Sequence, residues 1–125
     1  MGILTNATWM CGIIGLLTPA TDSAPAAGDV AEDIASRLEL IRHRGPDMAS
    51  VHSVGDHVAF AHARLAIVDV ESGKQPFVHR GNRMTSMLCI NGEIYNWKTI
   101  RDMIPDFEYA TENNDCESVM ALCLR

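Results

Sequence analysis

The sequence predicts a mixed α+β fold within at most one domain. Short apolar runs rich in β-branched residues occur between segments whose apolar residues recur at the spacing of a helix. With 125 residues, 47% of them hydrophobic and 21% charged, the chain can build one core. The helical segments are too few to cover both faces of the sheet that these strands would form. We therefore expect the front part of a larger domain, and the alternative is a small complete one.

The first third of the chain predicts a strand, a loop and a helix. Residues 11–17 form an apolar run with β-branched isoleucines, which predicts a short buried strand, and residues 18–28 predict a loop. A helix is expected to begin at Asp29, with Glu32 completing a capping box, and to stop at Gly45-Pro46. Apolar residues at helical spacing mark its inward face: Val30, Ile34, Leu38 and Ile41.

The middle of the chain predicts three further strands. Residues 58–63 and 65–70 are strand-like, and Ser72-Gly73 marks a turn after them. Residues 84–90 form another apolar run, long enough for a strand that is covered on both faces.

Two short helices are predicted after the turn signal Asn91-Gly92. One ends near Pro105, and the other begins after Asp115 and is still helical where the sequence stops, without a cap, at Arg125. Apolar residues at helical spacing mark the inward face of the first, namely Ile94, Trp97, Ile100 and Ile104. The inward residues of the second are expected to be Val119, Leu122 and Cys123.

Charge and hydropathy exclude two classes of partner. The net charge is −6 and the largest basic cluster is Arg42-His43-Arg44, so a nucleic-acid partner is not expected. No stretch approaches the ~20 apolar residues of a membrane span. Residues 9–17 raise the possibility of a signal peptide, but no Lys or Arg precedes Arg37, so the charged segment of such a peptide is missing. We expect a cytoplasmic protein.

The cysteines show no spacing typical of a metal site. They form no C-x-x-C pair, and no histidine lies at ligand spacing from them, so no metal is expected. The even number would allow two disulfides. Because three of the four lie inside apolar runs, free thiols are favoured. The four are Cys11, Cys89, Cys116 and Cys123.

Met10-Cys11 is the motif with the clearest chemistry. A cut between the two would give Cys11 a free α-amine, whose pKa is ~8, beside its own nucleophilic thiol. Residues 1–10 are then an N-terminal extension, propeptide or leader, and residues 11–125 are the domain. Two origins stay open: Met10 is the true start and is removed in the ordinary way, or a genuine propeptide is cleaved.

Four further segments carry polar residues in unusual groupings. Each has an ordinary structural explanation by itself, such as a helix end, a strand with charged ends or a turn. The segments are Arg42-His43-Arg44-Gly45-Pro46-Asp47, Arg64-Leu65-Ala66-Ile67-Val68-Asp69, Gln75-Pro76-Phe77 and Asn91-Gly92-Glu93-Ile94-Tyr95-Asn96.

Together with Met10-Cys11, and in this order, these segments resemble the glutaminase domain of class II glutamine amidotransferases. These are N-terminal-nucleophile hydrolases, and the asparagine synthetase branch is the most similar. The resemblance runs from Cys11 to about Cys123. Two other branches of the class carry His-Asn-Gly where this chain has Ile90-Asn91-Gly92. The resemblance implies a four-layer αββα sandwich whose C-terminal strands are missing here, and a homodimer for full-length members.

The resemblance implies a catalytic role for three residues. Cys11 would attack the side-chain amide of L-glutamine and pass through a thioester, with its own α-amine as the base. The side-chain amide of Asn91 and the backbone N–H of Gly92 would stabilise the oxyanion. A glycine at position 92 would bring that N–H close because it has no Cβ.

The remaining residues would bind the substrate or support the site. Arg64 would take the carboxylate of glutamine, and Asp115 its α-amino group, with Glu93 as a second acceptor. Backbone groups of four residues would line the pocket: Leu65, Ala66, Ile67 and Val68. Arg44 and Asn96 would frame the nucleophile. Asn113-Asn114 precede Asp115, where the family usually has Ser or Cys directly before that Asp.

The resemblance also implies a partner. The ammonia would pass to an ATP-using synthetase domain or subunit, and no Ser-Gly-Gly-x-Asp motif of such a domain occurs here. ATP and Mg²⁺ would belong to that missing part, and no cofactor is expected for these residues. The alternative function is an inactive glutaminase-like fragment that binds a partner or needs a missing half to fold.

Overall fold

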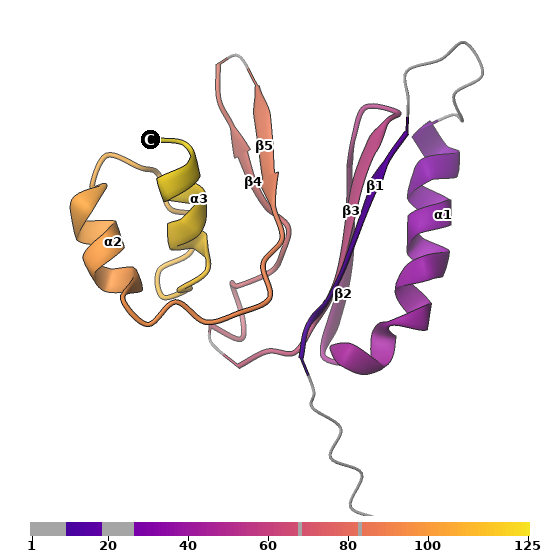
Figure 1. Cartoon of the computed structure of the whole chain (residues 1–125), viewed down its shortest axis with the longest axis horizontal. Coiled ribbons are helices and arrows are strands. Elements are labelled where there is room, and N and C mark those ends of the chain that lie inside the picture. The colour runs from indigo at the N-terminus through magenta and orange to yellow at the C-terminus, as the bar shows by residue number, and fades with distance from the viewer. Residues whose placement is uncertain (1–9, 19–26, 68, 83) are drawn as a thin grey trace, which may run out of the picture.

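A computed structural model of the chain describes residues 10–18, 27–67, 69–82 and 84–125. Within these ranges the chain forms two antiparallel sheets, three α-helices and one short 3-10 helix (Figure 1). The expected mixture of helices and strands is therefore confirmed.

The larger sheet is built around a central strand. It has the order β1-β3-β2, with β1 at Gly12–Leu17, β3 at Val58–Arg64 and β2 at Met48–Val54. In the register Gly12 lies opposite Ala63, so the start of β1 lies beside the end of β3. The strands expected at residues 11–17 and 58–63 are confirmed to within one residue. Strand β2 was not predicted, because two of its three half-buried positions, Ser50 and His52, are polar and it forms no apolar run.

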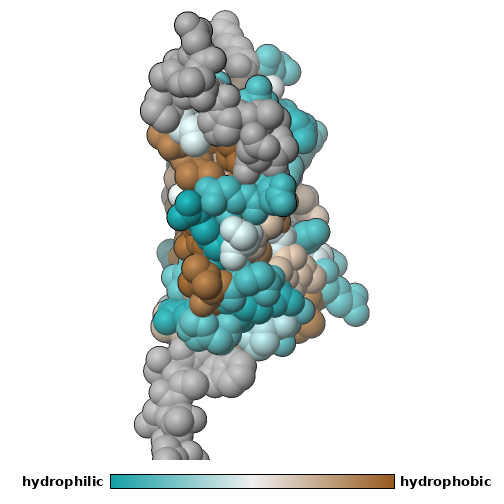
Figure 2. Space-filling view, turned by 90° about the vertical axis from the view of Figure 1, so that its right-hand side faces the viewer, coloured by the Kyte–Doolittle hydropathy of each residue, from teal (hydrophilic) through white to brown (hydrophobic). Residues whose placement is uncertain are grey.

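Helix α1, Ala27–Leu40, covers one face of this sheet. As predicted, Val30, Ile34 and Leu38 are buried, and they pack on small residues of β3 that let the helix come close. The helix begins at Ala27, so Asp29 lies in its first turn and does not precede it. Figure 2 faces this side of the molecule and shows mainly hydrophilic residues among smaller apolar patches. The small residues of β3 are Ala59, Ala61 and Ala63.

The predicted helix stop at Gly45-Pro46 is confirmed. A 3-10 turn, Arg42–Arg44, follows α1, and Gly45 then lies against the backbone of Ala63 and Arg64. A Cβ at position 45 would collide with these backbone atoms, so only glycine allows the close approach. The contact brings the segment after α1 against the end of β3, where the Asp47 N–H donates to the Arg64 carbonyl over 3.1 Å.

The prediction of a strand at residues 65–70 is wrong for the residues that the structure describes. There the chain leaves the sheet, and side chains take the place of a neighbouring strand. The Arg64 guanidinium donates to the carbonyls of Asp69 at 2.6 Å and Val70 at 2.9 Å. The Asp47 carboxylate accepts the Ala66 N–H at 2.8 Å. The predicted turn is confirmed, since the Gly73 N–H donates back to the Asp69 carbonyl at 3.0 Å.

The second sheet is a hairpin of β4, Phe77–Arg80, and β5, Thr85–Leu88. Strand β5 confirms the centre of the strand expected at residues 84–90. The expectation that both faces are covered is wrong, because all four residues of β5 are only half-buried in this two-stranded sheet. Strand β4 was not predicted as a strand.

The last two helices pack on each other. Helix α2, Trp97–Met103, buries Ile100 as predicted and leaves the other three expected core residues half-buried. Helix α3, Glu117–Cys123, corrects the prediction for its inward face, because Leu122 and Cys123 are exposed. The buried residues of α3 are instead Glu117, Ser118, Met120 and Ala121.

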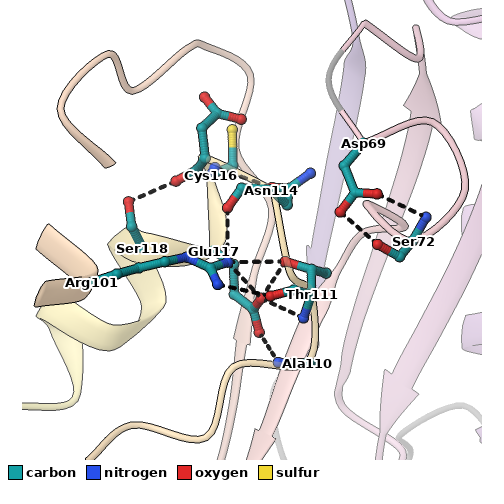
Figure 3. A network of polar contacts seen from close by, with 10 residues as sticks. Asp69, Ser72, Arg101, Ala110, Thr111, Asn114, Cys116, Glu117 and Ser118 are labelled. Carbon is teal, nitrogen blue, oxygen red and sulfur yellow. Dashed lines mark hydrogen bonds and ion pairs between the residues drawn. The ribbon is translucent and has the colours of Figure 1, made fainter. Parts of the chain in front are cut away.

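A buried polar network decides which face of α3 points inward (Figure 3). The Glu117 carboxylate accepts the backbone N–H groups of Ala110 at 2.7 Å and Thr111 at 2.8 Å. Arg101 lies 3.5 Å from the same carboxylate and donates to the carbonyls of Thr111 and Asn114. A buried carboxylate needs such partners. The Glu117 carboxylate, and not the apolar pattern, therefore sets which face of α3 points inward.

The elements follow one another in layers across the view of Figure 1. Helix α1 lies outside the three-stranded sheet, the β4–β5 hairpin lies on the other side of that sheet, and α3 and α2 lie beyond the hairpin. Within the described residues, no helix is long and apolar enough to cross a membrane. All four cysteines are free, as favoured from the sequence.

Candidate active site

A cavity of about 160 Å³ lies where the start of β1, the end of β3 and the loops after β5 and before α3 meet. Its volume suits a ligand no larger than an amino acid, since drug-sized ligands occupy ~300–1,000 Å³. Eight of the residues proposed from the sequence line it: Cys11, Arg64, Leu65, Ile67, Asn91, Gly92, Glu93 and Asp115.

Cys11 is held at the cavity wall by two segments distant in sequence. The Leu65 N–H donates to the Cys11 Sγ at 3.3 Å, and the thiol lies 3.7 Å from the Leu65 carbonyl. From the other side, the side-chain amide of Asn91 donates to the Cys11 carbonyl at 3.1 Å. A thiol and an amide donor therefore lie together at one cavity, as a nucleophile and an oxyanion donor require.

Gly92 lies in open space. No heavy atom lies within 4 Å of the position that a Cβ would take there, so the chain itself gives no steric reason for glycine. The expectation that a glycine lets the Gly92 N–H approach the oxyanion concerns a bound substrate, and it stays a prediction. Its carbonyl accepts the Cys116 thiol at 3.3 Å. Burial, helped by the charge of Asp115, raises the pKa of Cys116 to about 12, so this thiol stays protonated and able to donate.

Arg64 supplies positive charge at one side of the cavity. It is 4% exposed, and its bonds to the carbonyls of residues 69 and 70 hold the guanidinium in place. Gly73 lies beside it, and a Cβ at that position would come within 2.6 Å of an Arg64 nitrogen. A side chain at position 73 would therefore displace the guanidinium.

Two carboxylates supply negative charge to the same cavity. Asp115 is 6% exposed, and its Oδ2 accepts the Ile94 N–H at 2.6 Å. Glu93 is exposed and lines the cavity as well. A cavity with a guanidinium and two carboxylates complements a zwitterion, which carries both charges on one carbon.

Three described residues among those proposed from the sequence do not line the cavity. Ala66 is held outside it by Asp47, and Val68 lies outside the described residues. Arg44 lies in the 3-10 turn, where its Cβ lies beside Gly12, the neighbour of Cys11. Asn96 is exposed directly before α2.

Gln75 is a wall residue for which the sequence indicated no role. Its side-chain Oε1 accepts the Ile90 N–H at 2.7 Å, and its backbone carbonyl accepts the Ser50 hydroxyl. It thereby joins β2 to the segment that carries Asn91. The Gln75-Pro76-Phe77 motif was the available signal. Five more wall residues were not proposed as site residues: Met10, Gly73, Ile90, Asn114 and Cys116.

Among the described residues, no three His, Cys, Asp or Glu side chains converge as metal ligands would. The cavity offers a thiol, amide donors and fixed charges of both signs.

Comparison with known proteins gives this arrangement a family. The glutamine amidotransferase domain family matches residues 10–125. The chain belongs to this family. Among the relatives of this glutamine amidotransferase domain is the glutamine-hydrolysing asparagine synthetase B of Escherichia coli (strain K12), 35% identical over 113 residues, or 90% of this chain and 19% of that protein.

Two further relatives are also named as glutamine-hydrolysing asparagine synthetases. The glutamine-hydrolysing asparagine synthetase of Triphysaria versicolor is 39% identical over 90% of this chain and 18% of its own length. Asparagine synthetase 1 of Saccharomyces cerevisiae, also glutamine-hydrolysing, is 44% identical over 68% of this chain and 14% of its own length. The amidotransferase chain thus spans about a fifth of the length of the curated relatives it matches.

Proposed function

We propose that this amidotransferase domain hydrolyses L-glutamine to glutamate and ammonia, and that the ammonia serves ATP-dependent synthesis of asparagine or a related amide. One observation carries the proposal. The Cys11 thiol, the amide of Asn91 and charges of both signs line a single cavity of amino-acid size. The family and the names of its relatives support glutamine as the nitrogen source.

The proposed reaction begins at Cys11. In a chain that starts at this residue, the α-amine accepts the thiol proton, and the thiolate attacks the side-chain amide carbon of glutamine. Asn91 and the N–H of Gly92 stabilise the oxyanion, each contributing about 3 kcal/mol. The intermediate collapses to a thioester and releases ammonia, which takes its third proton from the α-ammonium. Water then hydrolyses the thioester to glutamate and restores Cys11.

The remaining charges orient the substrate. Arg64 binds the α-carboxylate, for which a planar guanidinium is suited, and Asp115 and Glu93 bind the α-ammonium. Leu65 and Ile67 complete the wall. Because both charged groups of the ligand are then fixed, its side-chain amide is directed to Cys11.

The proposal also extends to the complete fold and to the partners of the whole protein. The order of layers in Figure 1 supports a four-layer αββα sandwich whose further strands lie outside residues 11–125. A synthetase domain or subunit would receive the ammonia and would bind ATP and Mg²⁺, and the full-length protein would be a cytoplasmic homodimer. Residues 1–10 would be removed before activity appears.

The test compares two forms of the chain. The form beginning at Cys11 should release ammonia from L-glutamine, and the form with residues 1–10 attached should not. Cys11→Ala in the shorter form is the control for contaminating glutaminases. N-terminal sequencing and intact mass show which form is assayed.

Two results would separate the alternatives. A folded chain that begins at Cys11 and binds L-glutamine without releasing ammonia would favour the inactive, partner-binding fragment. Release of ammonia at the same rate from the Cys11→Ala variant would reject Cys11 as the nucleophile.

A further inference from the structure

Asn114 presents an unused hydrogen-bond donor to the cavity. The residue is 4% exposed and lines the cavity beside Asp115. Its Oδ1 accepts the Cys116 N–H at 3.1 Å, which fixes the orientation of the amide and leaves Nδ2 on the opposite side. Within the described part of the chain, no group accepts a hydrogen bond from Nδ2. Because Asn114 lines the cavity, a ligand bound there can accept the hydrogen bond that Nδ2 otherwise donates to water.

The position of Gly73 shows what kind of ligand fits. The space that a Gly73 Cβ would occupy lies less than 3.0 Å from both the Asn114 Nδ2 and an Arg64 nitrogen. An amide and a guanidinium therefore converge over a residue that has no side chain. Two N–H donors side by side, one of them cationic, match the two oxygens of a carboxylate.

Asp115 is placed to bind the other charged group of such a ligand, its ammonium. It follows Asn114 directly and lines the same cavity. An α-amino acid carries its ammonium and carboxylate on one carbon, so their receptors must be neighbours. Adjacent amide and carboxylate side chains meet that condition.

We propose that Asn114 is a further substrate-binding residue, whose side-chain amide donates to the α-carboxylate of the bound amino acid beside Arg64. This inference rests on the proposed function for the identity of the ligand as L-glutamine. It makes Asn114 a determinant of specificity for a free α-carboxylate, and Gly73 the residue whose missing side chain lets the two donors lie close together.

The test exchanges the donor for an acceptor. Asn114→Asp keeps the oxygen that accepts the Cys116 N–H but replaces the amide donor by a negative charge. In a full-length Cys11→Ala background, which prevents turnover, calorimetric titration would give the affinities for L-glutamine and for L-glutamine α-amide. Asn113→Asp is the matched control, because it adds the same charge one residue away, at an exposed side chain that does not line the cavity.

We expect Asn114→Asp to bind L-glutamine at least about 100-fold more weakly, because one charge-assisted bond is lost and a repulsion is gained. The α-amide should bind at least as well as before, since it can donate to the new carboxylate. Asn114→Ser, which keeps a shorter acceptor, should weaken L-glutamine binding about tenfold. Asn113→Asp should change the ratio of the two affinities less than about threefold.

Three outcomes would overturn the inference. The ratio of the affinities for L-glutamine and its α-amide could be unchanged in a folded Asn114→Asp variant, or it could change as much in Asn113→Asp as in Asn114→Asp. The third outcome is that the Cys11→Ala background chain does not bind L-glutamine. The proposed function is judged separately by ammonia release. A chain that binds L-glutamine through Asn114 and releases no ammonia would leave this inference standing and reject hydrolysis. Hydrolysis together with an unchanged ratio would reject this inference alone.

Discussion

Asn91 connects two parts of the molecule that are 80 residues apart in sequence. Its amide donates to the Cys11 carbonyl, so the loop after β5 is tied to the residue before β1. The same amide is the proposed oxyanion donor. The spacing of these residues gave no indication of that contact, because only the folded chain brings the two segments together.

We expect Asn91→Ala to lower kcat for glutamine hydrolysis about 100- to 1,000-fold and to change KM little, because the donor acts mainly in the transition state. Steady-state ammonia release from chains that begin at Cys11 would measure both constants. Asn113→Ala, at an exposed position away from the cavity, is the control. An unchanged kcat in Asn91→Ala would reject the oxyanion assignment.

His62 should make stability depend on pH. It is 1% exposed, and neither ring nitrogen has a hydrogen-bond partner among the described residues. Burial, and secondarily the charge of Arg64, lowers the pKa of His62 to about 4 from 6.5. Between these values the unfolded chain binds a proton that the folded chain does not, so stability falls as pH falls, by up to roughly 1.4 kcal/mol per pH unit.

Urea unfolding at pH 7, 6 and 5 would measure this effect. In His62→Phe the loss of stability over that range should be clearly smaller, because no ring is protonated on unfolding. His43→Gln removes an exposed histidine and should leave the loss unchanged. Equal pH dependence in His62→Phe and the unsubstituted chain would contradict the assignment.

At the scale of elements, patterns of apolar spacing predicted helices well where one face meets an apolar layer. Helix α1 follows its pattern because Val30, Ile34 and Leu38 pack on alanines of β3. Helix α3 departs from its pattern because buried Glu117 must face Arg101 and the N–H groups before it. The sequence shows a glutamate, but not that its partners lie in another helix and a loop.

We expect Glu117→Ala to destabilise the fold by about 3–5 kcal/mol, because it leaves the Arg101 charge and two backbone N–H groups buried without their partner. The side chains of Arg101 and Glu117 are only 15% and 5% exposed. Urea unfolding would measure the loss, with Glu112→Ala at an exposed position as the control. A loss below about 1 kcal/mol would mean that the network does not hold α3.

The segment after β3 shows a second limit of local patterns. Residues 65–70 have the composition of a strand, yet Leu65 and Ile67 line the cavity, and the described residues of this segment leave the sheet. Arg64 and Asp47 bond to their backbone groups and so replace the neighbouring strand. Composition reports that a segment is apolar, whereas its partner decides whether it joins a sheet.

At the scale of the whole molecule, the fold separates the cysteines by reactivity. Cys116 is buried and Cys89 half-buried, and burial raises their pKa values to about 12 and about 11, whereas Cys123 is exposed. The thiolate is the reactive form, so burial suppresses alkylation in the folded chain.

With iodoacetamide at pH 8 we expect Cys123 to be alkylated more than about 100-fold faster than Cys116, because far less thiolate is present at Cys116. Peptide mapping by mass spectrometry would give the rates. Unfolding in urea should make the rates similar, and it serves as the internal control. Equal rates in the native chain would contradict the packing of the loop before α3.

The sequence by itself determined the class of fold, the core face of α1, the free thiols and the set of motifs whose order indicated a glutamine amidotransferase. These depend on local spacing and on residue chemistry, which a linear pattern records. Only the tertiary structure decided that Gln75, Gly73 and Asn114 belong to the same cavity as Cys11, and that α3 turns Glu117 inward. Such features depend on which distant groups satisfy a buried charge, donor or backbone, and spacing along the chain does not record those partners.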